Sequence, residues 1–382
     1  MALCFAYGLN VTFLIFWPVI NIYYPAHLVS TFSLDPEVRK EKSKMKILGI
    51  EFAPLSLPLE RRLQTAAVFY YCSSFIFLGT SMLGLCLYLI FSKFFFIPLL
   101  YFTWFVYDHK TCCQGGRRSE WVRNWKLWKY FADYFPVTLV KTADFDPKKN
   151  YILGYHPHGI MCYGAFACFG TEARKFSDHF PGITPHILTL EGQFWFPVHR
   201  EHIMCSGACA ATRESIEWLL TKKGKGNALI LVVGGAAEAL DAHPGDVNLT
   251  LKRRKGFVRL ALKHGASLVP VFAFGENEIF EQIDNPEGSF LRQIQNKLKS
   301  FLGFSTPFFR GRGMFQYNYG LLPYRKPITV IIGKPIDVEK ISEPTDEDIK
   351  TLHQKYVDSL TALFEEHKDM EREVNKLIQN VD

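Results

Sequence analysis

Two histidines flank a proline in the segment His156-Pro157-His158-Gly159, which follows the apolar run Tyr151 to Leu153. Histidine has an ordinary pKa near neutrality, so an imidazole that is held in a defined direction suits a general base. Pro157 fixes its own φ, and Gly159 can adopt backbone conformations that other residues avoid, so the turn is stiff. We therefore predict a catalytic base in this pair and assign it to His158, with His156 assisting it, although the residue types and spacing do not distinguish the two. The alternative is a pair of half-buried turn histidines that bond only to backbone groups.

A metal site is the weaker interpretation of this histidine pair. Zinc needs three or four ligands, and the chain contains no Cys-x-x-Cys or His-x-x-Glu-His segment to supply them. We expect no bound metal. The segment Asn150 to Phe166 predicts instead a strand, a tight turn and a helix. In open α/β sheets, ligands bind just past the carboxyl end of such a strand.

A second apolar run, Ala228 to Val233, leads into Gly234-Gly235 and then into Glu238. We predict that the glycine pair lets the backbone approach a substrate closely. Glu238 would then lie beside a strand end, as the histidines do, where a carboxylate can orient an imidazole and stabilise its charged form. An ordinary glutamate that favours a helix N-terminus through the helix dipole is an equally good explanation.

Four consecutive basic residues, Lys252 to Lys255, precede Gly256 and an apolar helix. Such a cluster can bind phosphates, and we assign this role to Arg254 and Lys255. A solvated charged surface is the usual alternative for such a run. Glu276 and Asn277 follow another apolar run, and we predict that they also line the substrate site.

The composition limits the classes of partner. The 382-residue chain is 48% hydrophobic and 21% charged and contains 34 Phe, so it is richer in apolar residues than most soluble enzymes. The formal net charge of +7 favours an anionic partner, either a phosphate-bearing co-substrate or a membrane surface. The chain has no recognisable nucleic-acid-binding module, so we exclude nucleic acid. The 9 cysteines show no paired framework, which indicates reduced thiols facing the cytosol.

The first part of the chain is apolar enough to enter a membrane. Met1 to Phe32 contain no Lys, Arg, Asp or Glu, and Ala2 to Tyr24 is long enough to span a bilayer. The mostly basic stretch Arg39 to Lys46 would place that flank in the cytoplasm. Alternatively, Met45 serves as the start, and residues 1–44 are an optional extension. The sequence leaves both interpretations open.

The strongest membrane segment is Ala66 to Ile90, which carries no charged residue. Lys93 interrupts the apolar character, and Phe94 to Val106 continues it but is too short for an ordinary span. Basic pairs, Arg61-Arg62 and Arg117-Arg118, flank the two pieces, so both outer ends face the cytoplasm. We predict a helical hairpin with Lys93 near its tip; two core helices of a soluble protein are the alternative. The predicted units are an extension over 1–60, the hairpin over 61–107 and a cytosol-facing domain over 108–382.

After Asp108 the chain alternates between apolar runs and amphipathic segments, which is typical of an α/β domain with a mainly parallel sheet. We predict strands at Tyr151–Leu153, Ala228–Val233, Leu268–Phe274 and Ile328–Ile332, and helices at Thr171–Phe180, Arg213–Lys222 and Gly256–His264. Thr345 and Asp348 predict a capping box at the start of the last long helix. A helix around Trp121 to Phe131 lies either on a bilayer or against the domain.

The motifs together resemble the type-2 diacylglycerol acyltransferase family, which includes monoacylglycerol acyltransferases and wax synthases. In chain order they are Tyr134-Phe135-Pro136, His156-Pro157-His158-Gly159, Val232-Val233-Gly234-Gly235-Ala236, Arg254-Lys255-Gly256-Phe257 and Phe274-Gly275-Glu276-Asn277. The resemblance runs from about Ile50 to Lys368, and the presence of all these motifs in order makes it specific. The stretches 51–55, 60–64 and 315–321 look most like the monoacylglycerol branch.

This resemblance implies a glycerolipid-acyltransferase-like α/β fold with an N-terminal membrane hairpin. It implies an enzyme of the endoplasmic-reticulum membrane, with its catalytic domain facing the cytosol, that transfers a fatty acyl group from acyl-CoA to the hydroxyl of a monoacylglycerol or diacylglycerol. Acyl-CoA is then a co-substrate, and no other cofactor is expected. The implied partners are acyl-CoA, neutral acylglycerols, the bilayer and the lipid-droplet surface, and we also include self-association as a homo-oligomer.

One feature departs from the related glycerolipid acyltransferases, which carry an Asp five residues after the catalytic His. Here those positions hold Met161 and Tyr163, so the local partner is missing and Glu238 becomes a candidate for a distant one. Two other functions remain open at this point. One is acyl transfer to a wax alcohol or retinol, and the other is a non-catalytic lipid-droplet protein that uses only the hairpin.

Overall fold

A computed structural model describes residues 45–47, 49–54, 56–302 and 304–379. The predictions for residues 1–44 lie outside the described residues. The strands are β1 (Met45–Ile47), β2 (Ile50–Phe52), β3 (Thr138–Lys141), β4 (Tyr151–His156), β5 (Thr184–Thr189), β6 (Cys209–Ala210), β7 (Asn227–Val232), β8 (Ser267–Phe274), β9 (Glu281–Gln282), β10 (Phe309–Arg310) and β11 (Thr329–Ile332).

The α-helices are α3 (Leu59–Ser73), α4 (Gly79–Ile90), α5 (Phe96–Asp108), α6 (Glu120–Arg123), α7 (Lys126–Tyr134), α8 (Tyr163–Ala165), α9 (Phe176–His179), α10 (His199–Cys205), α11 (Arg213–Thr221), α12 (Gly235–Glu238), α13 (Gly256–His264), α14 (Phe290–Leu302) and α15 (Asp346–Gln379). Two π-helical segments, η2 (Ser74–Leu78) and η4 (Phe166–Gly170), continue α3 and α8. Short 3-10 helices occur at His109–Cys113, Glu191–Trp195 and Ala239–Asp241.

The main sheet has seven strands in the order β3-β11-β8-β4-β7-β5-β6, and β4 lies in its centre. All neighbouring strands are parallel except β11 and β8, which are antiparallel. This confirms the predicted α/β class and the mainly parallel sheet. Each of the four predicted strands is present. The other three strands of this sheet, β3, β5 and β6, were not predicted, and none of them has a long apolar run.

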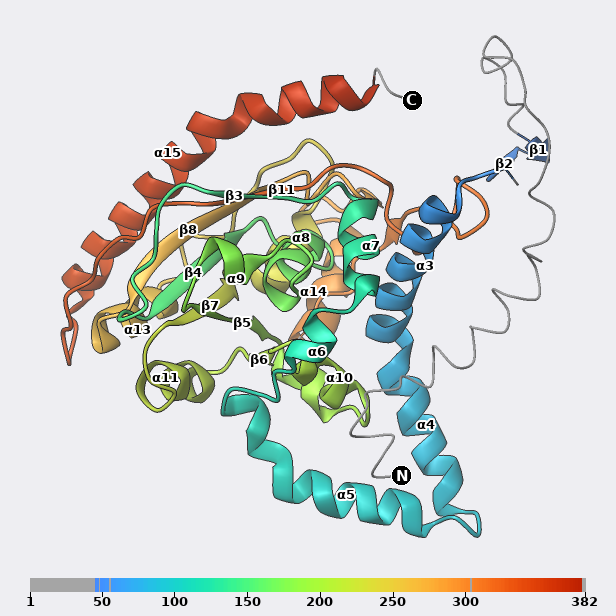
Figure 1. Cartoon of the computed structure of the whole chain (residues 1–382), viewed down its shortest axis with the longest axis horizontal. Helices are drawn as coiled ribbons and strands as arrows, with labels where there is room; N and C mark the ends of the chain where they lie inside the picture. The colour runs from blue at the N-terminus through green and yellow to red at the C-terminus, as the bar shows by residue number, and fades with distance from the viewer. Residues whose placement is uncertain (1–44, 48, 55, 303, 380–382) are drawn as a thin grey trace.

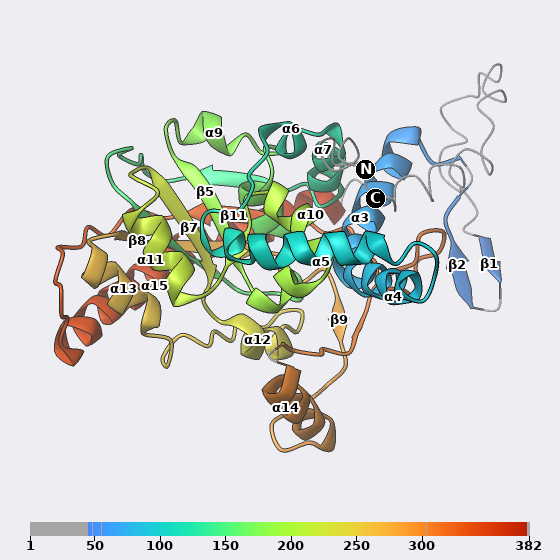
Figure 2. The ribbon, with the colours of Figure 1, turned by 90° about the horizontal axis from the view of Figure 1, so that it is seen from below.

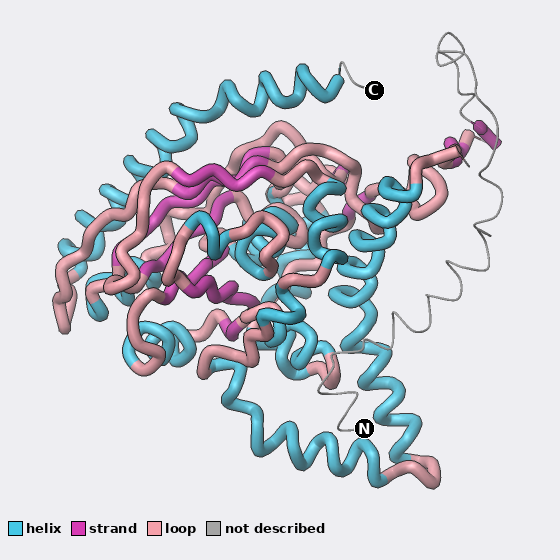
Figure 3. The backbone as a smooth tube through the Cα atoms, viewed as in Figure 1, coloured by secondary structure: helices cyan, strands magenta, loops and turns pink. Residues whose placement is uncertain are grey.

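Helices cover both faces of this sheet (Figures 1 and 3). Because side chains alternate along a strand, β4 contributes to two separate cores. Tyr151, Leu153 and Tyr155 pack in the core that contains α3 and α7. Ile152 packs in the opposite core, which contains α11, α13 and α15. The same alternation directs His156 to the α15 face of the sheet.

α3, η2 and α4 form one helix, Leu59–Ile90, which is long and apolar enough to cross a membrane. Its first half packs against α7 and buries Ala67 and Val68. Residues 61–78, which the sequence analysis placed in the hairpin, are therefore partly covered by the α/β domain. In contrast, α4 exposes large apolar side chains such as Tyr88, and it projects from the domain with α5 (Figures 1 and 2).

α4 and α5 contact each other and are joined by a turn that contains the exposed Lys93, as expected for the tip of a hairpin. Polar contacts tie α5 to the domain. The Tyr101 hydroxyl donates to the Glu201 carboxylate at 2.9 Å, and the buried Arg200 lies 2.8 Å from Asp108. The returning helix is thus attached to α10 at its middle and at its end.

The predicted helix Thr171–Phe180 is wrong, because only Phe176–His179 is helical. Buried contacts hold the preceding residues in an irregular path. Arg123, which is fully buried, donates to the Thr171 carbonyl at 3.4 Å and to the Glu172 carboxylate at 2.7 Å. These tertiary bonds override the local helical pattern.

The predicted aromatic helix is divided into α6 and α7, because Trp125 adopts an extended conformation between them. Trp128 and Phe131 are buried in the core with α3, whereas Trp121 is 57% exposed. α7 therefore packs against the domain. The predicted capping box is present: the Thr345 N–H donates to Asp348 at 2.9 Å, and the Asp348 N–H donates back to Thr345 Oγ1 at 3.2 Å.

Candidate active site

His156 ends β4 and is fully buried against α15. The Tyr356 hydroxyl donates to the Gly154 carbonyl at 3.1 Å, so it can only accept from the His156 Nε2, which lies 3.1 Å away. A side chain at Gly154 would collide with this hydroxyl, so the glycine is needed for the contact. Burial lowers the pKa of His156 to about 3, and its Nδ1 is buried without a partner. His156 is therefore neutral and lies behind the turn.

His158 lies after the turn and is only half-buried. Its Nδ1 is 2.9 Å from the Gly159 carbonyl oxygen, which can only accept, so Nδ1 carries the proton. Nε2 then has its lone pair available, and none of the described residues forms a hydrogen bond to it. Burial lowers the pKa of His158 below its usual 6.5, so the ring is neutral at pH 7. This is the tautomer and the charge that a general base needs.

The cysteine nearest to His158 is not an activated nucleophile. Cys162 donates its thiol proton to the His158 carbonyl at 3.0 Å, and its sulfur lies 3.7 Å from Nδ1. Burial raises the pKa of Cys162 far above its usual value, so the thiol remains protonated. It supports the turn rather than attacking a substrate.

Glu238 does lie beside His158, but it contacts the backbone rather than the imidazole. One carboxylate oxygen accepts from the His158 N–H at 2.9 Å, and the other accepts from the Thr250 N–H at 2.8 Å. Burial raises the pKa of Glu238, and these two donors oppose the rise. Contrary to the prediction, this carboxylate forms no hydrogen bond to the imidazole ring. Glu238 instead fixes the turn and attaches it to the segment around Thr250.

One residue of the glycine pair makes room for this carboxylate. A side chain at Gly234 would collide with the Glu238 carboxyl group, so only glycine leaves room for it. Gly235 is the first residue of α12. Arg254 Nη2 donates to the Gly234 carbonyl at 3.2 Å, so the first residue of the motif Arg254-Lys255 also lies next to Glu238.

Glu276 and Asn277 occupy different environments. Glu276 is buried beneath the turn and accepts from the Tyr155 hydroxyl at 2.8 Å and from the N–H groups of Tyr163 and Gly164 at 2.6 and 2.9 Å. Burial raises its pKa to about 7. Asn277 donates to the Asp246 carbonyl at 2.8 Å. Neither side chain reaches His158, so the structure places Glu276 as a support of the turn.

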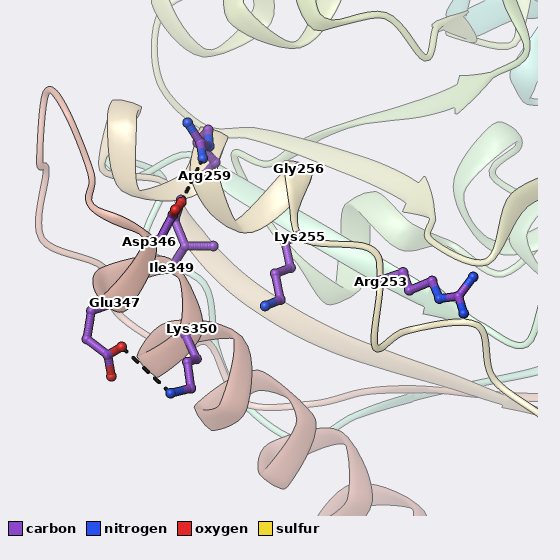
Figure 4. Close-up of a pocket in the computed structure, with 8 residues that line it drawn as sticks. All are labelled: Arg253, Lys255, Gly256, Arg259, Asp346, Glu347, Ile349 and Lys350. Carbon is purple, nitrogen blue, oxygen red and sulfur yellow. Dashed lines mark hydrogen bonds and ion pairs between the residues drawn. The ribbon is translucent and has the colours of Figure 1, made fainter.

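The basic run Lys252–Lys255 lies between two hollows of the surface. The first, with a volume of about 540 Å³, is polar and is shown in Figure 4; Arg253, Lys255, Arg259 and Lys350 line it together with Asp346 and Glu347. The second, of about 680 Å³, is an apolar groove between the segment after Val247, β8 and α15. Its wall includes Leu249, Leu251, Phe272, Val357, Leu360 and Phe364, and the exposed Lys252, Lys255 and Lys350 also line it.

Sequence reasoning missed three contributors to this region. Tyr356 was assigned only to the core stripe of the last helix, Thr250 acts through its backbone, and Lys350 belongs to no motif. The helical spacing of α15 could have indicated that Lys350 and Tyr356 share one helix, but not which strand that helix covers. Among the described residues, no group of His, Cys, Asp and Glu side chains could hold a metal ion.

Comparisons with known proteins agree with the motifs. Residues 87–379 match the family model described as diacylglycerol acyltransferase. The chain is 52% identical over 321 residues to 2-acylglycerol O-acyltransferase 1 of Bos taurus, covering 84% of this chain and 96% of the relative. It is 49% identical over 311 residues to diacylglycerol O-acyltransferase 2 of Homo sapiens, covering 81% and 80%.

Among solved structures, the chain is similar to the 1-acyl-sn-glycerophosphate acyltransferase PlsC from Thermotoga maritima. The sequence identity is 12% and the TM-score is 0.37, with 80% of this chain and 96% of the other covered.

Proposed function

Because this chain belongs to the diacylglycerol acyltransferase family, we propose that it transfers a fatty acyl group from acyl-CoA to the hydroxyl of a monoacylglycerol or diacylglycerol. The observation that carries the chemistry is the state of His158, a neutral imidazole with its proton on Nδ1 and an unbonded Nε2. In the reaction, the acceptor oxygen attacks the thioester carbonyl while His158 Nε2 takes the hydroxyl proton. The C–S bond then breaks, and the CoA sulfur receives that proton.

The two carboxylates act as positioning residues in this proposal. Glu238 holds the backbone of His158, and Glu276 holds the first N–H groups after the turn. Both contacts limit the movement of the imidazole relative to β4. His156 supports the end of β4 from the α15 side, because its Nε2 donates to the Tyr356 hydroxyl.

We place the protein in the endoplasmic-reticulum membrane, with the α/β domain on the cytosolic side and access to lipid-droplet surfaces. The helix Leu59–Ile90 supports membrane attachment. The exposed apolar side chains of α4 and α5 and the basic residues that flank the pair support the orientation. A neutral acceptor would then reach His158 from the bilayer.

The acceptor is tested by direct competition. Purified protein is incubated with labelled oleoyl-CoA and equal amounts of monoacylglycerol, diacylglycerol and a long-chain alcohol, and the products are separated. We expect diacylglycerol and triacylglycerol to predominate, because the first relative acts on 2-acylglycerols according to its name. A predominance of wax ester would reject the acylglycerol acceptor, and the absence of acceptor-dependent CoA release would reject catalysis altogether.

The donor site gives a separate prediction. We expect the double variant Arg254→Gln/Lys255→Gln to raise the KM for acyl-CoA more than the KM for the acylglycerol, because Lys255 lines both hollows and can bind a polyanion there, and Arg254 is its exposed neighbour. The difference should shrink at high salt, since screening weakens contacts of exposed charges. Lys222→Gln/Lys225→Gln removes the same number of exposed charges elsewhere and is the control. Equal KM changes for both substrates would contradict the assignment.

A further inference from the structure

The polar hollow and the apolar groove meet at two lysines. Lys255, at the start of α13, and Lys350, on α15, line both of them. Figure 4 shows these two lysines on opposite elements, with the space between α13 and α15 separating them. The two hollows are therefore adjacent, and the lining changes from apolar to charged at this pair. No motif in the sequence had indicated a role for α15 in binding.

The apolar groove is suited to a hydrocarbon chain. Its volume of about 680 Å³ lies in the range of small-molecule sites. Phe272, Leu251 and Leu360 form buried parts of its wall, and the lysines among its lining residues are exposed. An uncharged acylglycerol offers these exposed ammonium groups no negative charge to attract. A chain that ends in an anionic group matches both features.

The polar hollow is suited to phosphates. Four cations, Arg253, Lys255, Arg259 and Lys350, face two carboxylates there, so the hollow has excess positive charge. Two of the cations are already paired, Arg259 with Asp346 at 3.2 Å and Lys350 with Glu347 at 3.7 Å. Lys255 forms no such pair among the described side chains. These exposed pairs are weak, so a polyanion can compete with the carboxylates.

The groove also lies close to the catalytic turn. Leu249 and Leu251 in its wall flank Thr250, and the Thr250 N–H shares the Glu238 carboxylate with the His158 N–H. His353, which also lines the groove, lies 3.2 Å from the Leu251 carbonyl. On the sheet, Phe272 of the groove pairs in register with His156. Only the segment Leu249 to Leu251 therefore lies between a hydrocarbon chain in the groove and the His158 backbone.

From these contacts we propose that the two hollows are one binding site for the acyl-CoA donor, to which the C-terminal helix α15 contributes. The acyl-pantetheine arm lies in the apolar groove, and the phosphates lie in the polar hollow between Lys255 and Lys350. This inference rests on the proposed acyl transfer and assigns its donor site. A fatty acid shares the chain and the negative charge but lacks the phosphates, so it is the alternative source of the same chemistry.

The direct test is photolabelling of the solubilised full chain with palmitoyl-CoA that carries a diazirine near the chain end. We expect labelled peptides from residues 247–255 and 350–364, and both unlabelled palmitoyl-CoA and CoA alone should reduce the labelling. Label concentrated on other peptides would overturn the proposal. So would equal labelling by diazirine-palmitic acid that CoA does not reduce, because the groove would then bind fatty acids. Labelling in the His158→Ala variant separates donor binding from catalysis, since it needs no turnover.

Variants on α15 test the two halves of the site. Lys350→Gln should raise the KM for acyl-CoA about two- to fivefold, the range expected for an exposed charge contact, and leave the acceptor KM unchanged. Lys355→Gln on the same helix is the matched control. Thr361→Trp should fill the groove and reduce kcat/KM several-fold for long-chain relative to short-chain acyl-CoA, whereas Thr351→Trp should not. Identical effects of each variant and its control would contradict the assignment.

Discussion

Replacement of His158 by alanine is expected to lower acyl transfer by about 10²–10⁴-fold, the contribution typical of a general base. His158 is only half-buried and its Nε2 bonds to none of the described residues, so the replacement should leave the fold intact. The rate of acyl transfer to monoacylglycerol and the melting temperature are measured together in detergent. His179→Ala, which removes an exposed imidazole, is the control.

The dependence of the rate on pH gives an independent check of this role. Burial lowers the pKa of His158, so the imidazole stays neutral to a lower pH than an exposed histidine does. The rate should therefore persist as the pH falls and decline only below pH 6.5. Near-normal transfer by His158→Ala with an intact melting temperature, or an acid limb above pH 6.5, would refute the assignment.

Replacement of Glu238 by glutamine should give the second largest effect. The carboxylate accepts from two backbone N–H groups, and an amide can accept from only one of them without turning its own donors towards the other. The His158 turn should then shift, and a displacement of about 1 Å can cost about 10²-fold in rate. We expect kcat to fall by this order.

The pH profile distinguishes the two possible modes of action of Glu238. If Glu238 acts through the backbone, the acid limb of Glu238→Gln stays close to its position in the parent protein, because the lost carboxylate bonds to main-chain N–H groups and not to the ring. If Glu238 stabilised a charged imidazole, the limb would move to lower pH in the variant. Glu217→Gln, at an exposed ion pair on α11, is the matched control. Unchanged kcat in Glu238→Gln would contradict the positioning role.

The strands were predictable because β4, β7 and β8 are apolar on both faces, as buried central strands must be. α13 was predicted to the residue, since Gly256 precedes a clear amphipathic repeat. The segment after Gly170 was not predicted correctly, because its path depends on Arg123, which lies far away in the sequence. Local pattern contains no information about such a contact.

The candidate site was likewise predicted only in part. The sequence identified His158 and Glu238 as neighbours of two strand ends, and the parallel pairing of β4 with β7 brings them together. It did not reveal that the carboxylate bonds to a backbone N–H, since main-chain contacts leave no residue signature. It also treated Glu276 as a substrate ligand, although the motif residue is buried with three donors of its own.

The helix Leu59–Ile90 has no loop between the half that packs on the α/β domain and the half that is exposed. With α4 inserted in a bilayer as proposed, the domain cannot rotate independently of that helix. Helices adapt to thinner or thicker bilayers by changing their tilt. Such a tilt would swing the whole domain and change the height of the His158 turn above the lipid. The rate of acyl transfer would then change with bilayer thickness, because the tilt of the long helix sets the position of the domain.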